Sequence, residues 1–178
     1  MSPKKIHIHH IMAPRSVVTF DIDLDHAYQK QCIDKAYEIG DNMGGATNVK
    51  ASMSTYHVYE QTDVYNKILT DITNSLIYAP WAEVNNYVYT LESAWVSIYR
   101  DGDHTISHRH FPAVISFCYY LKADESSAPL VFDKTNLSIQ PKSGLCVLFD
   151  GSLIHSVPKH EGKQDRLILA GNYLLVTK

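Results

Sequence analysis

The sequence has few cysteines, no long apolar run and little excess charge of either sign. Cys32, Cys118 and Cys146 are odd in number, scattered and set among apolar residues. This pattern argues against a disulfide framework or a cysteine-based zinc site, and it predicts buried thiols in a reducing compartment. No stretch approaches the ~18 apolar residues of a membrane span, and the first ten residues lack the apolar centre of a secretory signal. We therefore expect a cytoplasmic protein that does not associate with membranes.

The formal net charge is −3, so the chain has no excess of basic residues that would indicate a nucleic-acid partner. The chain has 178 residues, of which 45% are apolar and 20% charged, as in ordinary globular domains with one sizeable core. No repeat, low-complexity tract or linker divides it. We expect a single domain over residues 1–178, and these features carry no information on its oligomeric state.

The first eighty residues predict a mainly helical support region. Apolar residues recur at helical spacing between Asp25, which can cap a helix, and Ile39, and Gly40 follows as a stop. A second helix is expected from the capping residue Thr62 to about Ala79, where a proline ends it. Residues 41–54 between these helices are expected to form a flexible loop, either a plain connector or a lid.

Before the first helix, the run S-V-V-T-F predicts an early strand. His7, His9 and His10 precede it. We expect them on an edge strand or a loose arm, with a metal-binding cluster as the alternative.

The hydrophobic period changes after residue 80. Short β-like runs follow, separated by Gly, Pro, Asp, Ser and Lys. They are Tyr87–Leu91, Ala94–Tyr99, Val114–Leu121, Leu130–Phe132, Leu137–Gln140, Leu145–Phe149, Ile154–Val157 and Arg166–Val176. Short strands with turns between them predict a sandwich or barrel, for which a jelly roll is one architecture. The fold class is therefore α+β, with helices packed on one sheet of a β core over residues 81–178.

Three of the ten histidines lie between Asp101 and His110, in the stretch D-G-D-H-T-I-S-H-R-H. His108 and His110 stand two residues apart, so on a strand both rings project from one face. Paired neutral imidazoles are suitable ligands for Fe, Zn, Ni or Cu. The best third ligand is His155, in F-D-G-S-L-I-H-S-V, and His104 is a weaker substitute within the stretch. The alternative is that these histidines only decorate the surface.

Four ordered blocks of the chain together resemble the Fe(II)/2-oxoglutarate-dependent dioxygenases. They are W-V-S-I-Y-R-D-G-D, H-R-H-F-P-A-V-I-S-F-C-Y-Y-L, G-L-C-V-L-F-D-G-S-L-I-H-S-V-P and R-L-I-L-A-G-N-Y, within residues 81–176. The sequence is most similar to a small branch near the prolyl-hydroxylase-like enzymes. The resemblance implies a double-stranded β-helix, which is a cupin-like jelly roll. It also implies Fe(II), 2-oxoglutarate and O2 as cofactors, and hydroxylation of a protein side chain or a small molecule with release of succinate and CO2.

The resemblance also assigns roles to single residues. His108 and His155 match iron ligands, whereas His110 stands where the superfamily usually has Asp or Glu. Arg166 matches the cation that binds the distal carboxylate of 2-oxoglutarate, and Tyr120 the tyrosine that assists it. Three further positions correspond to the cosubstrate pocket or its strand face: Tyr99, Ser116 and Asn172.

Purely structural roles are the alternative for several of these residues. Arg166 can pair with Asp165 or Glu161 at a strand mouth, and Tyr99 and Asn172 can serve core packing. Two other classes of protein are also compatible with the sequence. One is a cupin-type metal enzyme that does not use 2-oxoglutarate, and the other is a non-catalytic β-sandwich binding module.

Overall fold

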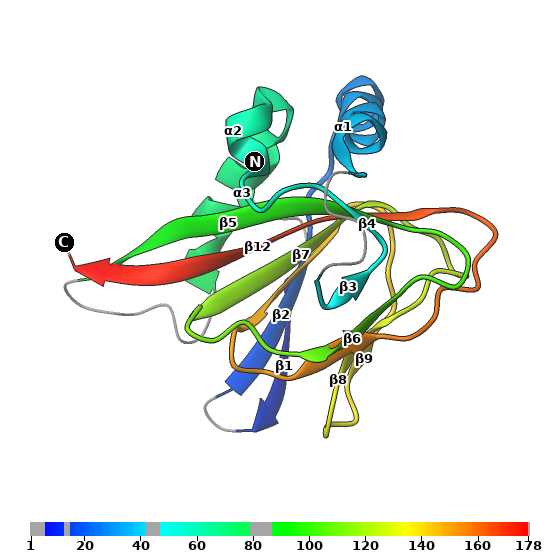
Figure 1. The fold of residues 1–178 in the computed structure, drawn as a ribbon. Helices are drawn as coiled ribbons and strands as arrows, with labels where there is room; N and C mark the ends of the chain where they lie inside the picture. The colour runs from blue at the N-terminus through cyan, green and yellow to red at the C-terminus, as the bar shows by residue number, and fades with distance from the viewer. Residues whose placement is uncertain (1–5, 13–14, 42–46, 79–86, 178) are drawn as a thin grey trace.

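The computed structural model describes residues 6–12, 15–41, 47–78 and 87–177. Two antiparallel sheets face each other, and the helices cover the outer face of the larger one (Figure 1). This confirms the predicted α+β jelly roll with helices on one sheet. No helix in the described ranges is long and apolar enough to cross a membrane.

The large sheet has seven strands in the order β1-β2-β10-β7-β12-β5-β4. Their bounds are β1 Ile6–Met12, β2 Arg15–Asp21, β4 Ser52–Met53, β5 Tyr87–Tyr99, β7 Ile115–Lys122, β10 Leu145–Asp150 and β12 Arg166–Thr177. Alternation along β7 and β12 places one set of side chains towards the helices and the other towards the small sheet. The predicted early strand is β2, and β1 is the edge strand that carries His7, His9 and His10.

The small sheet has five strands in the order β3-β6-β11-β8-β9. Their bounds are β3 Val49–Lys50, β6 His104–His108, β8 Leu130–Phe132, β9 Ser138–Ile139 and β11 His155–Val157. Strand β11 is central, and its first residue, His155, pairs with His108 of β6. Sheet pairing thus brings together two histidines that are far apart in the sequence.

The helical layer contains α1 (His26–Ile39), α2 (Val58–Gln61), η1 (Asp63–Tyr65), α3 (Asn66–Ser75) and η2 (Leu76–Tyr78). Asp25 caps α1 by accepting a hydrogen bond from the Tyr28 backbone N–H at 2.9 Å, as predicted. Gly40 follows α1 in a right-handed conformation. A Cβ there would lie 2.7 Å from the Ile98 side chain of β5, so glycine allows the helix end to approach the sheet.

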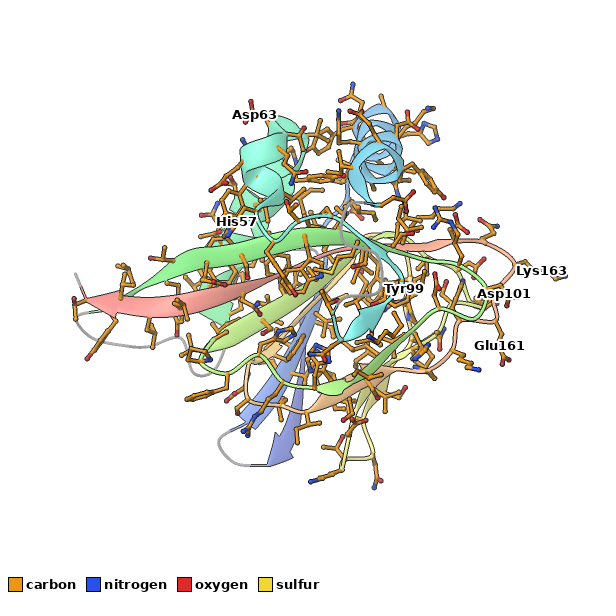
Figure 2. The ribbon with its side chains drawn as sticks, in the orientation of Figure 1. His57, Asp63, Tyr99, Asp101, Glu161 and Lys163 are labelled. Carbon is orange, nitrogen blue, oxygen red and sulfur yellow. The ribbon has the colours of Figure 1, made fainter. Side chains whose placement is uncertain are left out.

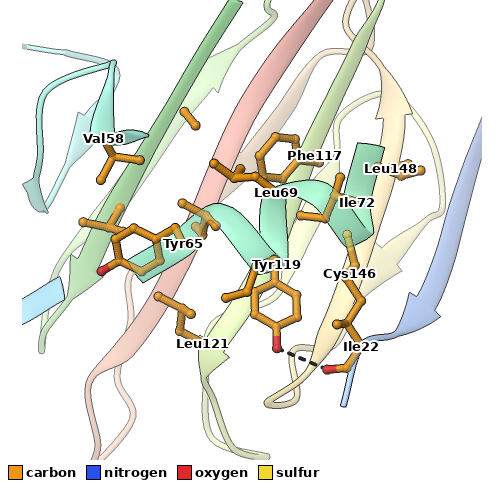
Figure 3. Close-up of a cluster of buried hydrophobic side chains, with 14 of the residues drawn as sticks. Ile22, Val58, Tyr65, Leu69, Ile72, Phe117, Tyr119, Leu121, Cys146 and Leu148 are labelled. Carbon is orange, nitrogen blue, oxygen red and sulfur yellow. Dashed lines mark hydrogen bonds between the residues drawn. The ribbon is translucent and has the colours of Figure 1, made fainter. Parts of the chain in front are cut away.

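One of the two apolar cores lies between the helices and the large sheet. Figure 3 shows Tyr65, Leu69 and Ile72 packed on side chains of the sheet, where the Tyr119 hydroxyl donates to the Ile22 carbonyl at 3.2 Å. The second core lies between the two sheets and contains Trp95, Tyr99, Tyr120, Phe132 and Phe149. A cavity lined by Trp95, Tyr99 and Phe149 opens within this second core.

Three predictions about segments were wrong in detail. The helix expected from Thr62 is broken: Thr62 accepts from the Val64 N–H at 3.2 Å and starts a 3-10 turn, and α3 begins only at Asn66. Residues 41–54 are not simply a loop, because β3 and β4 within them pair with different sheets, and Gly44 and Gly45 lie outside the described residues.

The runs Tyr87–Leu91 and Ala94–Tyr99 were the third error, since they form the single strand β5. Its pairing with β12 shifts register where Asn172 faces Ser93 and Tyr173 faces Leu91, which explains the interrupted pattern. The region predicted as helical support also contributes four strands, β1 to β4, to the two sheets.

Candidate metal centre and cosubstrate cavity

His108, His110 and His155 converge at one end of the space between the sheets. One ring nitrogen from each lies within 4.8 Å of the other two. The ring centroids are 4.4 Å apart for His108 and His155, and 5.0 Å apart for His110 and His155. Three imidazoles this close can bind one divalent ion and leave coordination positions open for other ligands.

Backbone contacts orient two of the rings. His108 Nδ1 lies 2.9 Å from the Ile106 carbonyl oxygen, and His155 Nδ1 lies 3.0 Å from that of Leu153. Since a carbonyl only accepts hydrogen bonds, each Nδ1 carries the proton and each Nε2 is left with a free lone pair. A histidine that binds a metal usually donates its second N–H in this way.

The surroundings keep all three rings neutral. Burial, and then the neighbouring imidazoles, lower the pKa of His110 to about 3 and that of His155 to about 4. Burial also lowers the pKa of His108. Only the neutral ring binds a metal, so the three residues fit a resident divalent ion.

Arg166, the first residue of β12, lines the same cavity as the three histidines. Its side chain is fully buried, and neither Nε nor Nη1 has a hydrogen-bond partner among the described residues. Neither predicted alternative partner is used: Asp165 accepts from the Tyr37 hydroxyl at 2.9 Å, and Arg166 forms no salt bridge with Glu161 or Asp165. A buried cation with two free N–H groups requires an anion.

Two tyrosine rings hold the guanidinium. Its Cζ atom lies 4.5 Å from the ring centroid of Tyr99 and 5.0 Å from that of Tyr120. Tyr99 lines the cavity, lies in the interior between the sheets (Figure 2), and shares a 2.6 Å hydrogen bond with Thr105. The Tyr120 hydroxyl lies 3.5 Å from Arg166 Nη2. These cation–π contacts fix where the guanidinium points.

Two solved structures with a similar fold are prolyl hydroxylases. The chain is similar to the 2-oxoglutarate complex of a viral collagen prolyl hydroxylase from Paramecium bursaria Chlorella virus-1, with 17% identity, a TM-score of 0.66 and coverage of 88% of this chain and 94% of that one. The corresponding values for a Pseudomonas putida prolyl-4-hydroxylase are 13%, 0.65, 90% and 93%. The sequence matches no family model and no curated protein.

A third similar structure is HygX from Streptomyces hygroscopicus, solved with nickel and 2-oxoglutarate bound. It is 11% identical, with a TM-score of 0.65 and coverage of 88% of this chain and 82% of that one. The chain has the fold of the 2-oxoglutarate-dependent oxygenases. These likenesses cover most of each chain, so the fold is shared as a whole.

Within this oxygenase fold, Ser116 and Asn172 lie apart from Arg166. The Ser116 hydroxyl donates to Asn172 Oδ1 at 2.8 Å, and Asn172 Nδ2 donates to Ser93 at 3.1 Å. Neither side chain lines the cavity that holds Arg166. Tyr120 lies against the guanidinium and is not a lining residue either. Their predicted contacts with a cosubstrate stay predictions.

His104 is not part of the histidine cluster. Its Nδ1 lies 3.4 Å from the Gly102 carbonyl oxygen, and His104 does not line the cavity that holds Arg166 and the three histidines. His104 is four residues before His108 on β6, yet it pairs with β3 at the far end of that strand.

A second cavity adjoins the first and shares Val49, Trp95, His108 and His110 with it. Its other lining residues are Thr47, Asn48, Met53, Tyr56, Arg109 and Asn172. Sequence reasoning missed Trp95 as a site residue, although it lies four residues before Tyr99 on the same strand and therefore on the same face. Asn172 belongs to this second cavity, on the other side of the histidines.

Proposed function

We propose that the chain is an Fe(II)- and 2-oxoglutarate-dependent oxygenase. It would hydroxylate a protein side chain or a small molecule with O2 and release succinate and CO2. The single observation that supports this best is the fully buried Arg166, whose unpartnered N–H groups lie in the cavity where three neutral imidazoles meet. A molecule with a metal-chelating end and a distal carboxylate fits both features.

Each residue has a role in binding. His108, His110 and His155 would hold the iron through Nε2 of their neutral rings. Arg166 would bind the distal carboxylate, because a planar guanidinium presents pairs of parallel N–H groups that match a carboxylate. Its Nε and Nη1 have no other hydrogen-bond partner among the described residues. Tyr120 would steady the guanidinium through its ring and hydroxyl.

The cavity walls would exclude water from the reaction. Most of the described residues that line this cavity are apolar, among them Leu130, Phe149, Val157, Ile168 and Ala170. A dry wall strengthens the charge pairing between Arg166 and a carboxylate. When bound, iron and 2-oxoglutarate supply the oxidising power, and the protein supplies ligands, orientation and shielding.

His110 in place of a carboxylate ligand favours a second candidate, a metal-dependent enzyme of cupin type that uses no 2-oxoglutarate. Such an enzyme has no need for a buried arginine without a partner in its metal cavity. Arg166 therefore supports the first candidate over the second, and 2-oxoglutarate binding distinguishes the two.

Two further proposals concern the protein as a whole. We propose that residues 1–178 form a single oxygenase domain. We also propose a cytoplasmic location, which is supported by three free cysteines that are all buried.

Replacing Arg166 by alanine tests the proposed function. We expect Arg166→Ala to weaken 2-oxoglutarate binding by roughly ten- to several-hundred-fold. A charge-assisted contact contributes about 1.5–3 kcal/mol, and without Arg166 the distal carboxylate of 2-oxoglutarate would be buried with no charged partner. The measurement is an anaerobic titration of the Fe(II) protein with 2-oxoglutarate, followed by the charge-transfer absorption band. Stoichiometric iron binding should persist, since Arg166 is not a ligand.

Arg100→Ala is the matched control. Arg100 is an exposed arginine that contacts Ser52 and lines neither cavity, so its loss should leave 2-oxoglutarate affinity unchanged. A wild-type protein that binds iron but gives neither an absorption band nor heat with 2-oxoglutarate would overturn the proposal and favour the cupin-type candidate.

A further inference from the structure

The second cavity has no acidic side chain among its described lining residues. Among the lining residues that the structure describes, Arg109 carries the only formal charge, and it lies between two of the proposed iron ligands in the sequence. Strand β6 ends at His108, so the alternation of faces stops there and Arg109 lines the same cavity as His108 and His110. Imidazole ligands are neutral, so the charge of a bound divalent ion would add to that of Arg109.

Arg109 is available to a ligand. It is exposed, and it forms no salt bridge with any residue in the described ranges. In contrast, exposed Arg100 contacts Ser52 Oγ at 2.6 Å and lies 3.8 Å from Asp41. An unpaired guanidinium at the rim of a cavity can bind an oxyanion through two parallel hydrogen bonds.

A buried donor at the floor of the cavity supports the same ligand chemistry. Trp95 is 5% exposed, lines both cavities, and its Nε1–H has no partner among the described residues. The indole N–H can only donate, so it requires an acceptor from a ligand or from water. Tyr56 packs edge-on against Trp95, with ring centroids 5.5 Å apart, and adds an apolar wall.

We propose that the molecule oxidised by this protein carries an oxyanion, a carboxylate or a phosphate, which Arg109 binds while an apolar part packs against Tyr56 and Trp95. The proposal rests on the proposed function and specifies the class of substrate. Arg166 and Arg109 divide the recognition of anions, because each lines only one of the two cavities. The first would bind the cosubstrate and the second the substrate.

The test measures binding of matched acid and amide probes to the anaerobic Fe(II) protein saturated with 2-oxoglutarate. The sequence has two tryptophans, so a Trp81→Phe background leaves Trp95 as the only indole reporter in the second cavity. One pair of probes is N-acetyl-aspartate amide and N-acetyl-asparagine amide, with N-acetyl-phosphoserine amide as the phosphate version. The other pair is cyclohexanecarboxylate and cyclohexanecarboxamide.

We expect at least one acid to change Trp95 fluorescence with an affinity roughly ten- to a hundredfold above its amide, as for one charge-assisted contact. Arg109→Gln should abolish that preference while 2-oxoglutarate affinity and iron stoichiometry stay unchanged. Preference for the capped residues indicates an acidic residue of a protein, and preference for cyclohexanecarboxylate indicates a small acid. Lys163→Gln is the matched control and should keep the preference for the acid, because it also removes an exposed positive charge. Lys163 lies in the loop between β11 and β12 and lines neither cavity (Figure 2).

Equal affinities for acid and amide, failure of every acidic probe to bind, or a preference that survives in Arg109→Gln would overturn the inference. The charge-transfer absorption band of the Fe(II) protein with 2-oxoglutarate, measured in the same samples, distinguishes failure of the proposed function from failure of the proposed substrate class. If the band forms and no acid preference appears, only the class of substrate is wrong. If the band is absent, the proposed function itself fails.

Discussion

His155 lies with 4% of its surface exposed between two phenylalanines, its ring centroid 6.3 Å from that of Phe132 and 4.8 Å from that of Phe149. The Leu153 carbonyl fixes its Nδ1. The aromatic wall and this contact hold the ring in place before any ion binds, so little side-chain entropy is lost on binding. His155 is the most buried of the three histidines.

We expect His155→Ala to abolish stoichiometric binding of Fe(II) or Ni(II), because two imidazoles remain where three converge. Truncating a buried side chain should also lower the free energy of unfolding by roughly 0.5–3 kcal/mol. Calorimetric titration with the metal, together with a denaturant melt, measures both effects.

His104→Ala is the matched control, since His104 lies on the same strand as His108 but outside the cluster. It should bind the metal like wild type. The three-histidine assignment is wrong if His155→Ala still binds one ion tightly or if His104→Ala loses it.

Strands β6 and β11 carry the proposed ligands, and a single carboxylate on their outer side joins them. Asp133, which follows β8, accepts a hydrogen bond from the Ser107 hydroxyl of β6 and another from the Ser156 hydroxyl of β11, the latter at 2.8 Å. Ser107 precedes His108, and Ser156 follows His155. Asp133 therefore maintains the spacing between the two ligand-bearing strands.

We expect Asp133→Ala to weaken metal binding by about tenfold, which is the lower end of the effects seen for residues that support metal ligands. The readout is metal affinity by calorimetry with global stability measured in parallel. Asp133→Asn, which keeps one acceptor oxygen, should recover part of the affinity.

Asp124→Ala is the matched control for Asp133→Ala. Asp124 also accepts from two serine hydroxyls, those of Ser126 at 2.7 Å and Ser127 at 3.3 Å, but in a loop that carries no proposed ligand. Its replacement should leave metal affinity unchanged. Equal losses from both variants would indicate a general effect on stability in place of a positioning role.

In the whole molecule, two of the three proposed iron ligands and the proposed 2-oxoglutarate-binding Arg166 belong to different sheets. His108 and His155 belong to the small sheet, whereas Arg166 is in the large one. Iron with 2-oxoglutarate would thus connect the two sheets across their shared core. Ligands that bind only the folded state stabilise it in proportion to the logarithm of their concentration.

We therefore expect Tm to rise in two steps, first with metal and then with 2-oxoglutarate. At 100 times its Kd, each ligand adds about 2.7 kcal/mol, or roughly 5–11 °C for a domain of this size. A thermal melt with chelator, with Ni(II), and with Ni(II) plus 2-oxoglutarate measures both steps. Arg166→Ala should show the first step and lack the second, and an equal second step in that variant would contradict the binding site.

Local sequence determined those elements whose pattern depends on near neighbours. The start of α1 followed from the cap at Asp25, and strand β8 has the predicted bounds Leu130–Phe132, because capping and alternation act over a few residues. The resemblance identified the fold as a double-stranded β-helix. His108, His110 and His155 were also singled out, since imidazole chemistry and spacing are visible in the sequence.

Tertiary structure decided what depends on long-range pairing. Strands β3 and β4 have two residues each and exist only because β6 and β5 provide backbone partners. The same pairing puts His155 opposite His108 and leaves His104 outside the cluster. It also buries Arg166 without a carboxylate partner, while Arg109 lines the neighbouring cavity. Burial and contact between distant residues arise only when the sheets close on each other, so no local pattern encodes them.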